Sequence, residues 1–219
     1  MNIENLVFSG GSIKAISYIG CIQALEEYDI RKNIKTIAGT SAGGFFASIM
    51  TLGYTAKEMK SIVLGIDFGM FKDITTESIL AFMNNYGFDT GNKLMQFIRI
   101  LIKKKCNNEN ITFQELYDLT NIQLILTGTC LNTKEVEYFS YKTHPEMKLI
   151  DAIRITVSIP LIYNKVQYEE KMYIDGAVLD NYPIQLFNQY KDKTIGFLLS
   201  STNDCNVSNI GNYIKSIIS

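Results

Sequence analysis

The sequence has little of several residue types on which common active sites depend. Its 219 residues include no tryptophan, three prolines and one histidine, His144. A single histidine excludes mechanisms that need two, including the usual zinc hydrolase sites. The four cysteines form no CxxC pair, which excludes a disulfide scaffold or a zinc module and is typical of a reducing compartment. They are Cys21, Cys106, Cys130 and Cys205.

An excess of charge of one sign is also lacking. Lysine and arginine number 21 against 22 aspartates and glutamates, for a net charge of −1. No positive field is therefore available to attract nucleic acid, and we expect no nucleic-acid partner. No apolar run reaches membrane-spanning length, and Met1–Asn5 lacks the pattern of a signal peptide, so we expect a cytoplasmic protein.

What is present is enough apolar material for a core, at 47% hydrophobic residues. No repeat or linker divides the chain, so we expect one domain over residues 1–219. Apolar strands at Asn5–Phe8 and Ile34–Ala38 each precede a helical pattern, the second from Ala42 to Leu52. This alternation predicts an α/β fold with a mixed sheet. Further strands are expected at Gln123–Cys130, Glu135–Tyr141, Tyr163–Tyr168, Lys171–Ile174 and Thr194–Leu199, with a last helix after them.

The middle of the chain is expected to be mainly helical. Thr55 and Thr112 each begin a capping box, in which a threonine and a glutamate satisfy free amides at a helix start. Residues 91–105 form an amphipathic helix with lysines at its end. We interpret it as a core-packing helix rather than a membrane-surface helix, because lysines suit the negative end of a helix dipole.

The strongest chemical signal is the GxSxG pentapeptide Gly39-Thr40-Ser41-Ala42-Gly43. Its glycines permit a sharp strand-to-helix turn that exposes a serine hydroxyl at a helix N-terminus. Such a position favours an attacking alkoxide and its oxyanion. Bare matches are often ordinary turns, but here an apolar strand precedes the serine and an apolar helix follows it. We therefore predict that Ser41 is a nucleophile.

A serine nucleophile needs a base, and two residues compete for that role. His144 precedes Pro145 in a polar turn, and we interpret it as an exposed loop histidine. Asp175 ends a short apolar strand and is followed by Gly176, a pair that also occurs in ordinary Asx turns. A carboxylate in that position can take the serine proton directly, without an imidazole.

A third segment, Ser9–Lys14, follows the first strand with two adjacent glycines. It matches neither the dinucleotide-binding nor the P-loop pattern. Its backbone amides are expected at the same sheet edge as Ser41, where they can stabilise an oxyanion.

Together these segments resemble the patatin-like phospholipase family of serine lipid acyl hydrolases. That family carries a glycine-rich oxyanion segment, a GxSxG about thirty residues later and a distant D-G-[GA] aspartate. The matching residues here are Gly10, Gly11, Lys14, Gly39, Ser41, Gly43, Asp175 and Gly176. The segments Asp180–Ile184 and Arg154–Pro160 also resemble family patterns, so the motif-bearing core runs from about residue 6 to 199.

The resemblance implies a three-layer α/β/α fold with a mostly parallel sheet. It also implies that Ser41 is the nucleophile, that Asp175 is the general base, and that the amides of Gly10, Gly11 and Ser12 hold the oxyanion. Ser12 and Ala15 replace family glycines, and Ser12 is expected to fit if its φ is negative. No metal or cofactor is implied.

The expected substrate is a membrane or micellar glycerolipid ester, met at the membrane surface, and the need for an activating protein stays open. Two alternatives stay open as well: an esterase or thioesterase for small substrates, and a catalytically weak lipid-binding protein. Residues 65–71 are apolar and glycine-rich. They are interpreted either as part of the cleft mouth or a flap, or as a buried loop.

Overall fold

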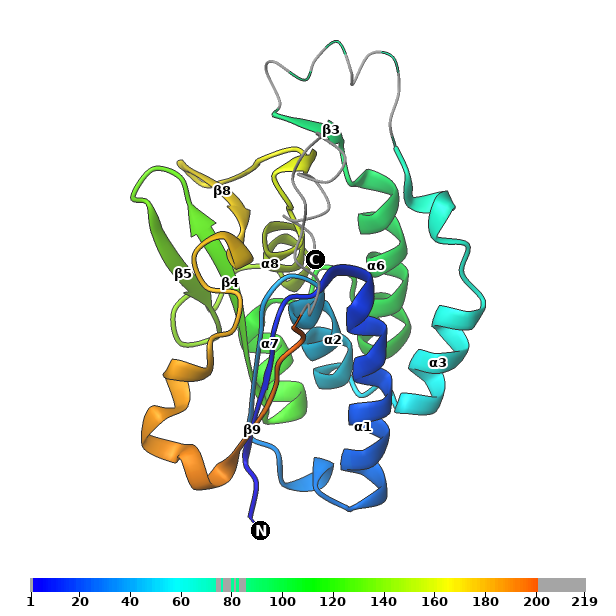
Figure 1. Cartoon of the computed structure of the whole chain (residues 1–219), viewed down its shortest axis with the longest axis vertical. Coiled ribbons are helices and arrows are strands. Elements are labelled where there is room, and N and C mark those ends of the chain that lie inside the picture. The colour runs from blue at the N-terminus through cyan, green and yellow to red at the C-terminus, as the bar shows by residue number, and fades with distance from the viewer. Residues whose placement is uncertain (1, 74–75, 77–79, 81, 83–85, 201–219) are drawn as a thin grey trace.

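A seven-stranded sheet forms the centre of the molecule (Figure 1). The computed structural model describes residues 2–73, 76, 80, 82 and 86–200. Strands follow the order β7-β8-β4-β2-β1-β9, and β5 pairs with β4. Four strands are parallel to one another: β1 (Asn5–Phe8), β2 (Thr36–Gly39), β4 (Gln123–Cys130) and β9 (Thr194–Phe197). Three are antiparallel to their neighbours: β5 (Glu135–Phe139), β7 (Val166–Tyr168) and β8 (Lys171–Asp175).

Strand β4 is twice as long as β2, and this difference positions the site. The last residue of β2, Gly39, lies opposite Leu126 in the middle of β4. Beyond that point β5 occupies one edge of β4, so β8 pairs along the edge that β2 has vacated. The last residue of β8, Asp175, lies opposite Gly128. Strands β2 and β8 therefore end close together from opposite directions.

Helices cover one face of the sheet, and a 3-10 segment covers the other (Figure 1). Alternate strand residues point to opposite faces. Leu6, Phe8 and Ile37 are buried in the core with the helices, whereas Val7 and Ala38 pack with Phe187 on the other side. The helices are α1 (Tyr18–Glu27), α2 (Ala42–Thr51), α3 (Ala56–Leu64), α6 (Asn92–Cys106), α7 (Phe113–Thr120) and α8 (Leu149–Thr156). The 3-10 segments used below are η1 (Ser12–Ser17), η3 (Phe68–Phe71), η4 (Gly176–Val178) and η5 (Ile184–Lys193).

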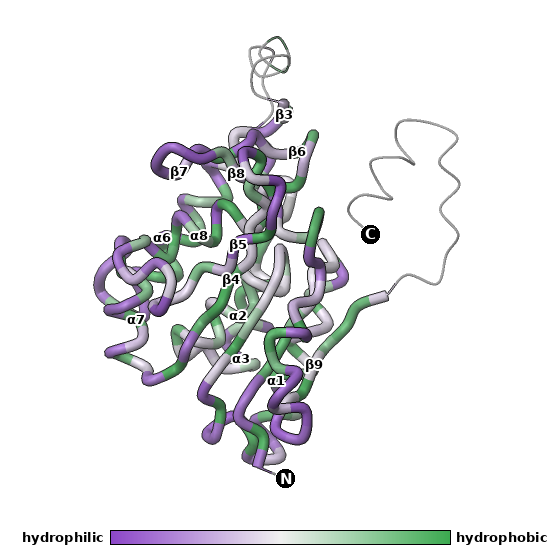
Figure 2. Tube along the Cα trace, turned by 90° about the vertical axis from the view of Figure 1, so that its left-hand side faces the viewer, coloured by the Kyte–Doolittle hydropathy of each residue, from purple (hydrophilic) through white to green (hydrophobic). Residues whose placement is uncertain are grey.

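The predicted α/β class, the layers and most predicted elements are confirmed. Both capping boxes form, at Thr55 before α3 and at Thr112 before α7. Helix α6 buries one apolar face in the core, as predicted. Strand β4 contains a hydrophobic stretch inside the molecule (Figure 2), and all its residues after Gln123 are buried. None of the helices described is long and apolar enough to cross a membrane.

The prediction of a single strand over Tyr163–Tyr168 is wrong. That stretch divides into β6 (Leu161–Tyr163) and β7, and β6 pairs with β3 (Gly87–Asp89) in a separate two-stranded sheet. The break lies at Asn164, whose carbonyl oxygen accepts a hydrogen bond from the Arg154 guanidinium. The helix predicted after residue 199 lies outside the described residues.

Candidate active site

Ser41 sits on the sharp turn between β2 and α2. Its φ of 54° and ψ of −128° are an unusual conformation for a residue with a side chain. The turn is tight enough that the neighbouring glycines have no room for a Cβ. On Gly39 a Cβ would come within 2.7 Å of the Gly43 carbonyl oxygen, and on Gly43 it would overlap the Ser9 carbonyl oxygen. The GxSxG glycines thus permit the close approach of backbone that holds Ser41 in place.

Hydrogen bonds from three other segments fix the turn. The Ser41 amide donates to Thr156 Oγ1 at 2.9 Å, at the end of α8. The Thr40 hydroxyl donates to the Asp180 carbonyl oxygen at 3.0 Å and accepts from Thr127 of β4 at 2.9 Å. The strained backbone of Ser41 is therefore held from both sides.

Asp175 is the hydrogen-bond partner of the Ser41 side chain. Ser41 Oγ donates to Asp175 Oδ2 at 2.6 Å, and the Ala177 amide donates to Oδ1 at 2.8 Å. The Asp175 amide donates to the Ser158 carbonyl oxygen at 2.9 Å. Gly176 is required here because a Cβ would overlap the Thr127 hydroxyl. The two residues singled out from the sequence are thus in direct contact.

The carboxyl group of Asp175 is almost completely buried, with 1% of the residue exposed. Burial raises its pKa to about 7, since the ionised form loses its water. The hydrogen bonds from Ser41 and Ala177 act in the opposite direction, because they favour the carboxylate. A carboxyl with a pKa near neutrality is well matched to proton transfer with a serine hydroxyl.

The Gly10–Ser12 segment lies beside this pair, but its three amides are not equivalent. The Gly10 amide donates to the Asn181 carbonyl oxygen at 3.0 Å, so it is already engaged. The amides of Gly11 and Ser12 donate to no acceptor in the part of the chain that the structure describes. On Gly10 a Cβ would also overlap the Asn181 side chain and come within 3.3 Å of Ser41 Cβ.

Ser12 does not meet the condition of a negative φ under which a serine was expected to fit. Its φ is +49°, in the left-handed region that favours glycine. The physical reason is the turn itself, because η1 begins at Ser12 directly after the extended Gly11. Lys14, in the same segment, donates its amide to the Gly11 carbonyl oxygen at 3.0 Å and closes the first turn of η1.

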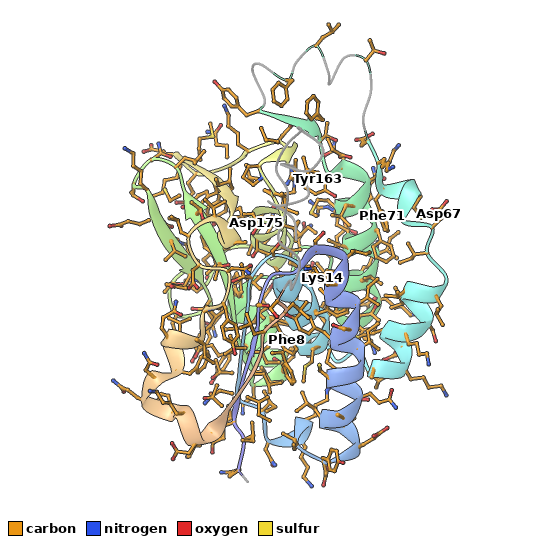
Figure 3. All side chains as sticks on the ribbon, viewed as in Figure 1. Phe8, Lys14, Asp67, Phe71, Tyr163 and Asp175 are labelled. Carbon is orange, nitrogen blue, oxygen red and sulfur yellow. The ribbon has the colours of Figure 1, made fainter. Side chains whose placement is uncertain are left out.

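An apolar cavity of about 440 Å³ begins at Ser41. It extends between α2, α3 and α6, and its wall includes Phe46, Met59 and Phe97. At its outer part lie Ser12 and Ile13 of η1. Figure 3 shows Phe71 and Tyr163, two further lining residues, near Asp175 and Lys14 at the upper centre of the molecule. The volume and the apolar wall are typical of a site for a hydrocarbon chain.

Residues 65–71 contribute to this cavity. The Asp67 carboxylate accepts from the Gly69 amide at 2.8 Å and begins the short turn η3. Phe71 is buried, and with Ile66 it lines the cavity, whereas Met70 is exposed. Of the interpretations of this segment, a position along the cleft is the one the structure supports.

Sequence reasoning gave no role to Arg154, which supports Asp175 indirectly. Its guanidinium is largely buried and donates to Ser158 Oγ at 2.5 Å and to the Thr90 carbonyl oxygen at 2.9 Å. Ser158 in turn accepts from the Asp175 amide. An arginine within a mainly apolar helical stretch, Leu149–Thr156, was the signal that could have identified it.

His144 is not part of the Ser41–Asp175 contact. Its ring packs edge-on against Phe139, and its Nε2 lies 4.0 Å from a Glu137 carboxylate oxygen. Burial lowers its pKa, so the neutral form is favoured. It is half-buried rather than exposed, because the turn after β5 folds back against the sheet.

Comparison with known proteins finds a matching family model and related sequences. The family model described as patatin-like phospholipase matches residues 6–188. Uncharacterized protein R571 of Acanthamoeba polyphaga mimivirus is 32% identical over 92% of this chain and 67% of its own length. Probable lipid hydrolase 463L of Invertebrate iridescent virus 6 is 26% identical over 87% of this chain and 65% of its own length. The chain thus spans about two thirds of the length of these two relatives.

Among solved structures, VipD from Legionella pneumophila has a similar fold. It superposes with a TM-score of 0.68 at 18% identity, over 90% of this chain and 49% of the VipD chain. At this identity the likeness concerns the fold alone. The described part of the present chain therefore has the architecture of about half of that protein.

Proposed function

The chain belongs to the patatin-like phospholipase family, and from that premise we propose that it is a serine acyl hydrolase acting on fatty-acyl esters of glycerolipids. Phospholipids and lysophospholipids are the substrates we expect first. The observation that carries the proposal is the 2.6 Å hydrogen bond between Ser41 Oγ and the buried Asp175 carboxylate, at the start of an apolar cavity.

In the first half of the proposed reaction, Ser41 Oγ attacks the ester carbonyl carbon while its proton passes to Asp175 Oδ2. The negative charge moves to the carbonyl oxygen, where the unengaged amides of Gly11 and Ser12 donate to it. Collapse of the tetrahedral intermediate breaks the bond to the alcohol oxygen. That oxygen takes the proton from Asp175 and leaves as the lyso product.

In the second half, water replaces the alcohol. Asp175 accepts a proton from water as the water oxygen attacks the acyl carbon of the Ser41 ester. The second intermediate collapses, Ser41 Oγ recovers the proton and the fatty acid leaves. Asp175 thus acts as base and acid in turn, and no second titratable group is required.

The shape of the cavity favours a long-chain ester over a small soluble one. Its wall is formed mainly by aliphatic and aromatic side chains, and Ile49, Ile62 and Leu94 are among those that come from α2, α3 and α6. A chain of many methylene groups gains from burial in such a cavity, whereas an acetyl group would leave most of it empty. This argues against the esterase alternative.

The test is covalent labelling with a fluorophosphonate probe, followed by fatty-acid release from phospholipid vesicles. We expect labelling and release by the native protein. Ser41→Ala should abolish both, because it removes the attacking oxygen. Asp175→Asn should lower both by at least about a thousandfold.

A conservative control is Thr129→Ser on β4, a residue with no part in the proposed reaction. It should retain activity within about twofold. Absence of labelling in folded native protein would overturn the catalytic proposal and favour a lipid-binding role. Labelling with release only from short soluble esters would favour the esterase alternative.

A further inference from the structure

We propose that four exposed apolar side chains beside the active site form a surface that docks on a lipid bilayer. They are Ile13, Val178, Leu179 and Leu198, and we call them the apolar rim. The inference rests on the proposed function, because a lipid hydrolase must take its substrate from a bilayer. It adds the part of the molecule that makes the contact.

The rim residues differ from other exposed apolar residues in position rather than in exposure, since Leu64 and Ile100 elsewhere are more exposed. Each is between 51 and 59% exposed, although the chain buries most of its large apolar side chains. Scattered exposed leucines are common on protein surfaces and need no explanation. A group of them around one opening is different, since exposed apolar patches mark sites of interaction with membranes or proteins.

Hydrogen bonds place the three rim segments around the same point. Leu198 precedes Leu199, whose amide donates to Ser9 Oγ at 2.9 Å and whose side chain lies against Gly11. Ile13 follows the Gly11–Ser12 amides within η1. In Figure 2 the hydrophobic end of β9 points out of the molecule on the side where the described chain ends.

The third segment, at Val178 and Leu179, lies directly beyond the base. These residues follow Asp175 by three and four positions in η4 and its C-cap. The next two residues form hydrogen bonds to the Ser41 turn and to the Gly10–Ser12 segment. The Asp180 carbonyl oxygen accepts from the Thr40 hydroxyl, and the Asn181 carbonyl oxygen accepts from the Gly10 amide. The rim therefore brackets Ser41 from the side of the oxyanion amides and from the side of the base.

The stretches that hold the rim residues carry no charge themselves, and the charged residues Lys14 and Asp180 follow Ile13 and Leu179 directly. Residues 9–13, 176–179 and 198–200 contain only glycine, alanine, serine and large aliphatic residues. With a net charge of −1, the chain has no overall excess of positive charge that would attract anionic lipids. These features fit insertion of apolar side chains among lipid tails, rather than electrostatic attraction to headgroups.

The rim is also continuous with the cavity. Ile13 belongs to both, since it is exposed at the surface and lines the cavity with Ser12 and Ser41. An acyl chain that leaves a bilayer against the rim can reach Ser41 along apolar side chains. It then avoids the cost of exposing its methylene groups to water. This continuity is the argument for a bilayer rather than a protein partner.

The test compares two double variants in vesicle flotation. Leu179→Gln with Leu198→Gln alters the rim without touching residues that line the cavity. Leu119→Gln with Leu131→Gln removes two exposed leucines elsewhere, on α7 and on the turn after β4. All binding is measured in the Ser41→Ala background, on neutral phosphatidylcholine vesicles, so that no lipid is consumed.

We expect the rim variant to lower vesicle partition by at least about tenfold, and the control pair by less than twofold. Raising the salt from 0.1 to 1 M should leave the partition within twofold, since no ion pairing is involved. Equal partition of the rim variant and the parent protein would overturn the proposal. So would self-association through the rim in place of vesicle binding, seen as a dimer that the rim variant abolishes.

Failure of the rim proposal is distinguishable from failure of the proposed function. With Ser41 intact, the rim variant should hydrolyse a soluble short-chain ester within twofold of the native rate. Native protein that binds vesicles but hydrolyses no ester would overturn the hydrolase assignment and leave the rim intact. Native protein that hydrolyses esters with unchanged vesicle partition in the rim variant would overturn the rim alone.

Discussion

The Ser41 hydroxyl and the Asp175 carboxylate are 134 positions apart in the chain and are joined by a 2.6 Å hydrogen bond. Neither residue can be moved without disturbing the sheet. Ser41 follows the end of β2 and Asp175 ends β8, and the register of both strands on β4 brings these ends together. The pair is therefore a property of the sheet and not of a flexible loop.

The first prediction concerns the pH dependence of catalysis. In the proposed mechanism Asp175 must be ionised to accept the serine proton, so activity should follow its deprotonation. Burial raises that pKa to about 7, so kcat/KM should rise about tenfold per pH unit below 7 and level off above 8. Initial rates on a soluble ester between pH 5 and 9 measure this. A rate that is already constant from pH 5 upward would contradict it.

The second prediction concerns the pH dependence of stability. Asp175 has a higher pKa in the folded protein, about 7, than the ordinary value of 3.8. Folding therefore takes up a proton between pH 4 and 7, and the free energy of unfolding should fall as pH rises through that window. Replacing Asp175 by asparagine removes this dependence. At pH 8 the variant should be more stable than the native protein by roughly 2–4 kcal/mol.

The measurement is chemical unfolding of both proteins at pH 5 and pH 8. At pH 5 the native carboxyl is mostly protonated, so the advantage of the variant should shrink sharply. An asparagine variant that is less stable at both pH values would indicate that the carboxylate is stabilised by its hydrogen bonds more than burial destabilises it.

The third prediction separates two glycines in helices. Gly43→Ala places a Cβ on the carbonyl oxygens of Phe8 and Ser9, so it should lower the free energy of unfolding by about 2–4 kcal/mol. Gly20 in α1 is exposed and has open space where a Cβ would lie. Gly20→Ala should therefore stabilise the protein by about 0.5–1 kcal/mol.

Urea unfolding of the two alanine variants tests this contrast. Gly43→Ala should also lose fluorophosphonate labelling, because the turn that holds Ser41 must shift. Gly20→Ala should keep its labelling. Equal stability of the two variants would mean that β1 and α2 can separate at little cost.

The fourth prediction concerns Ser12, which adopts a φ of +49°. A residue with a Cβ is strained there by about 1–2 kcal/mol, and glycine is not. Ser12→Gly should thus raise the free energy of unfolding by about 0.5–1 kcal/mol and preserve labelling. Ser17→Gly is the matched control in the same 3-10 segment, at a φ of −61°. It should destabilise the protein, since it also loses the hydrogen bond to the Lys14 carbonyl oxygen.

Thermal unfolding ranks these two variants. The opposite order, with Ser12→Gly the less stable, would show that the serine is not strained.

Much of the local structure was predictable because short-range chemistry decides it. The capping boxes at Thr55 and Thr112 need only residues three apart, and both form. The turn at Ser41 was also readable, since an apolar strand, glycines and an apolar helix occur in direct succession. The break between β6 and β7 at Asn164 was not predictable, because the Asn164 carbonyl oxygen is held by a hydrogen bond from Arg154.

The sequence by itself determined the sharp turn at Ser41, the glycines that permit it and the identity of the two polar residues that meet there. Only the tertiary structure decided that they meet, because that depends on β4 extending past β2 and pairing with β8 along the vacated edge. It also decided that the Gly10 amide is taken by Asn181, and that burial raises the pKa of Asp175. Both follow from contacts between segments that are distant in the sequence, which no local pattern records.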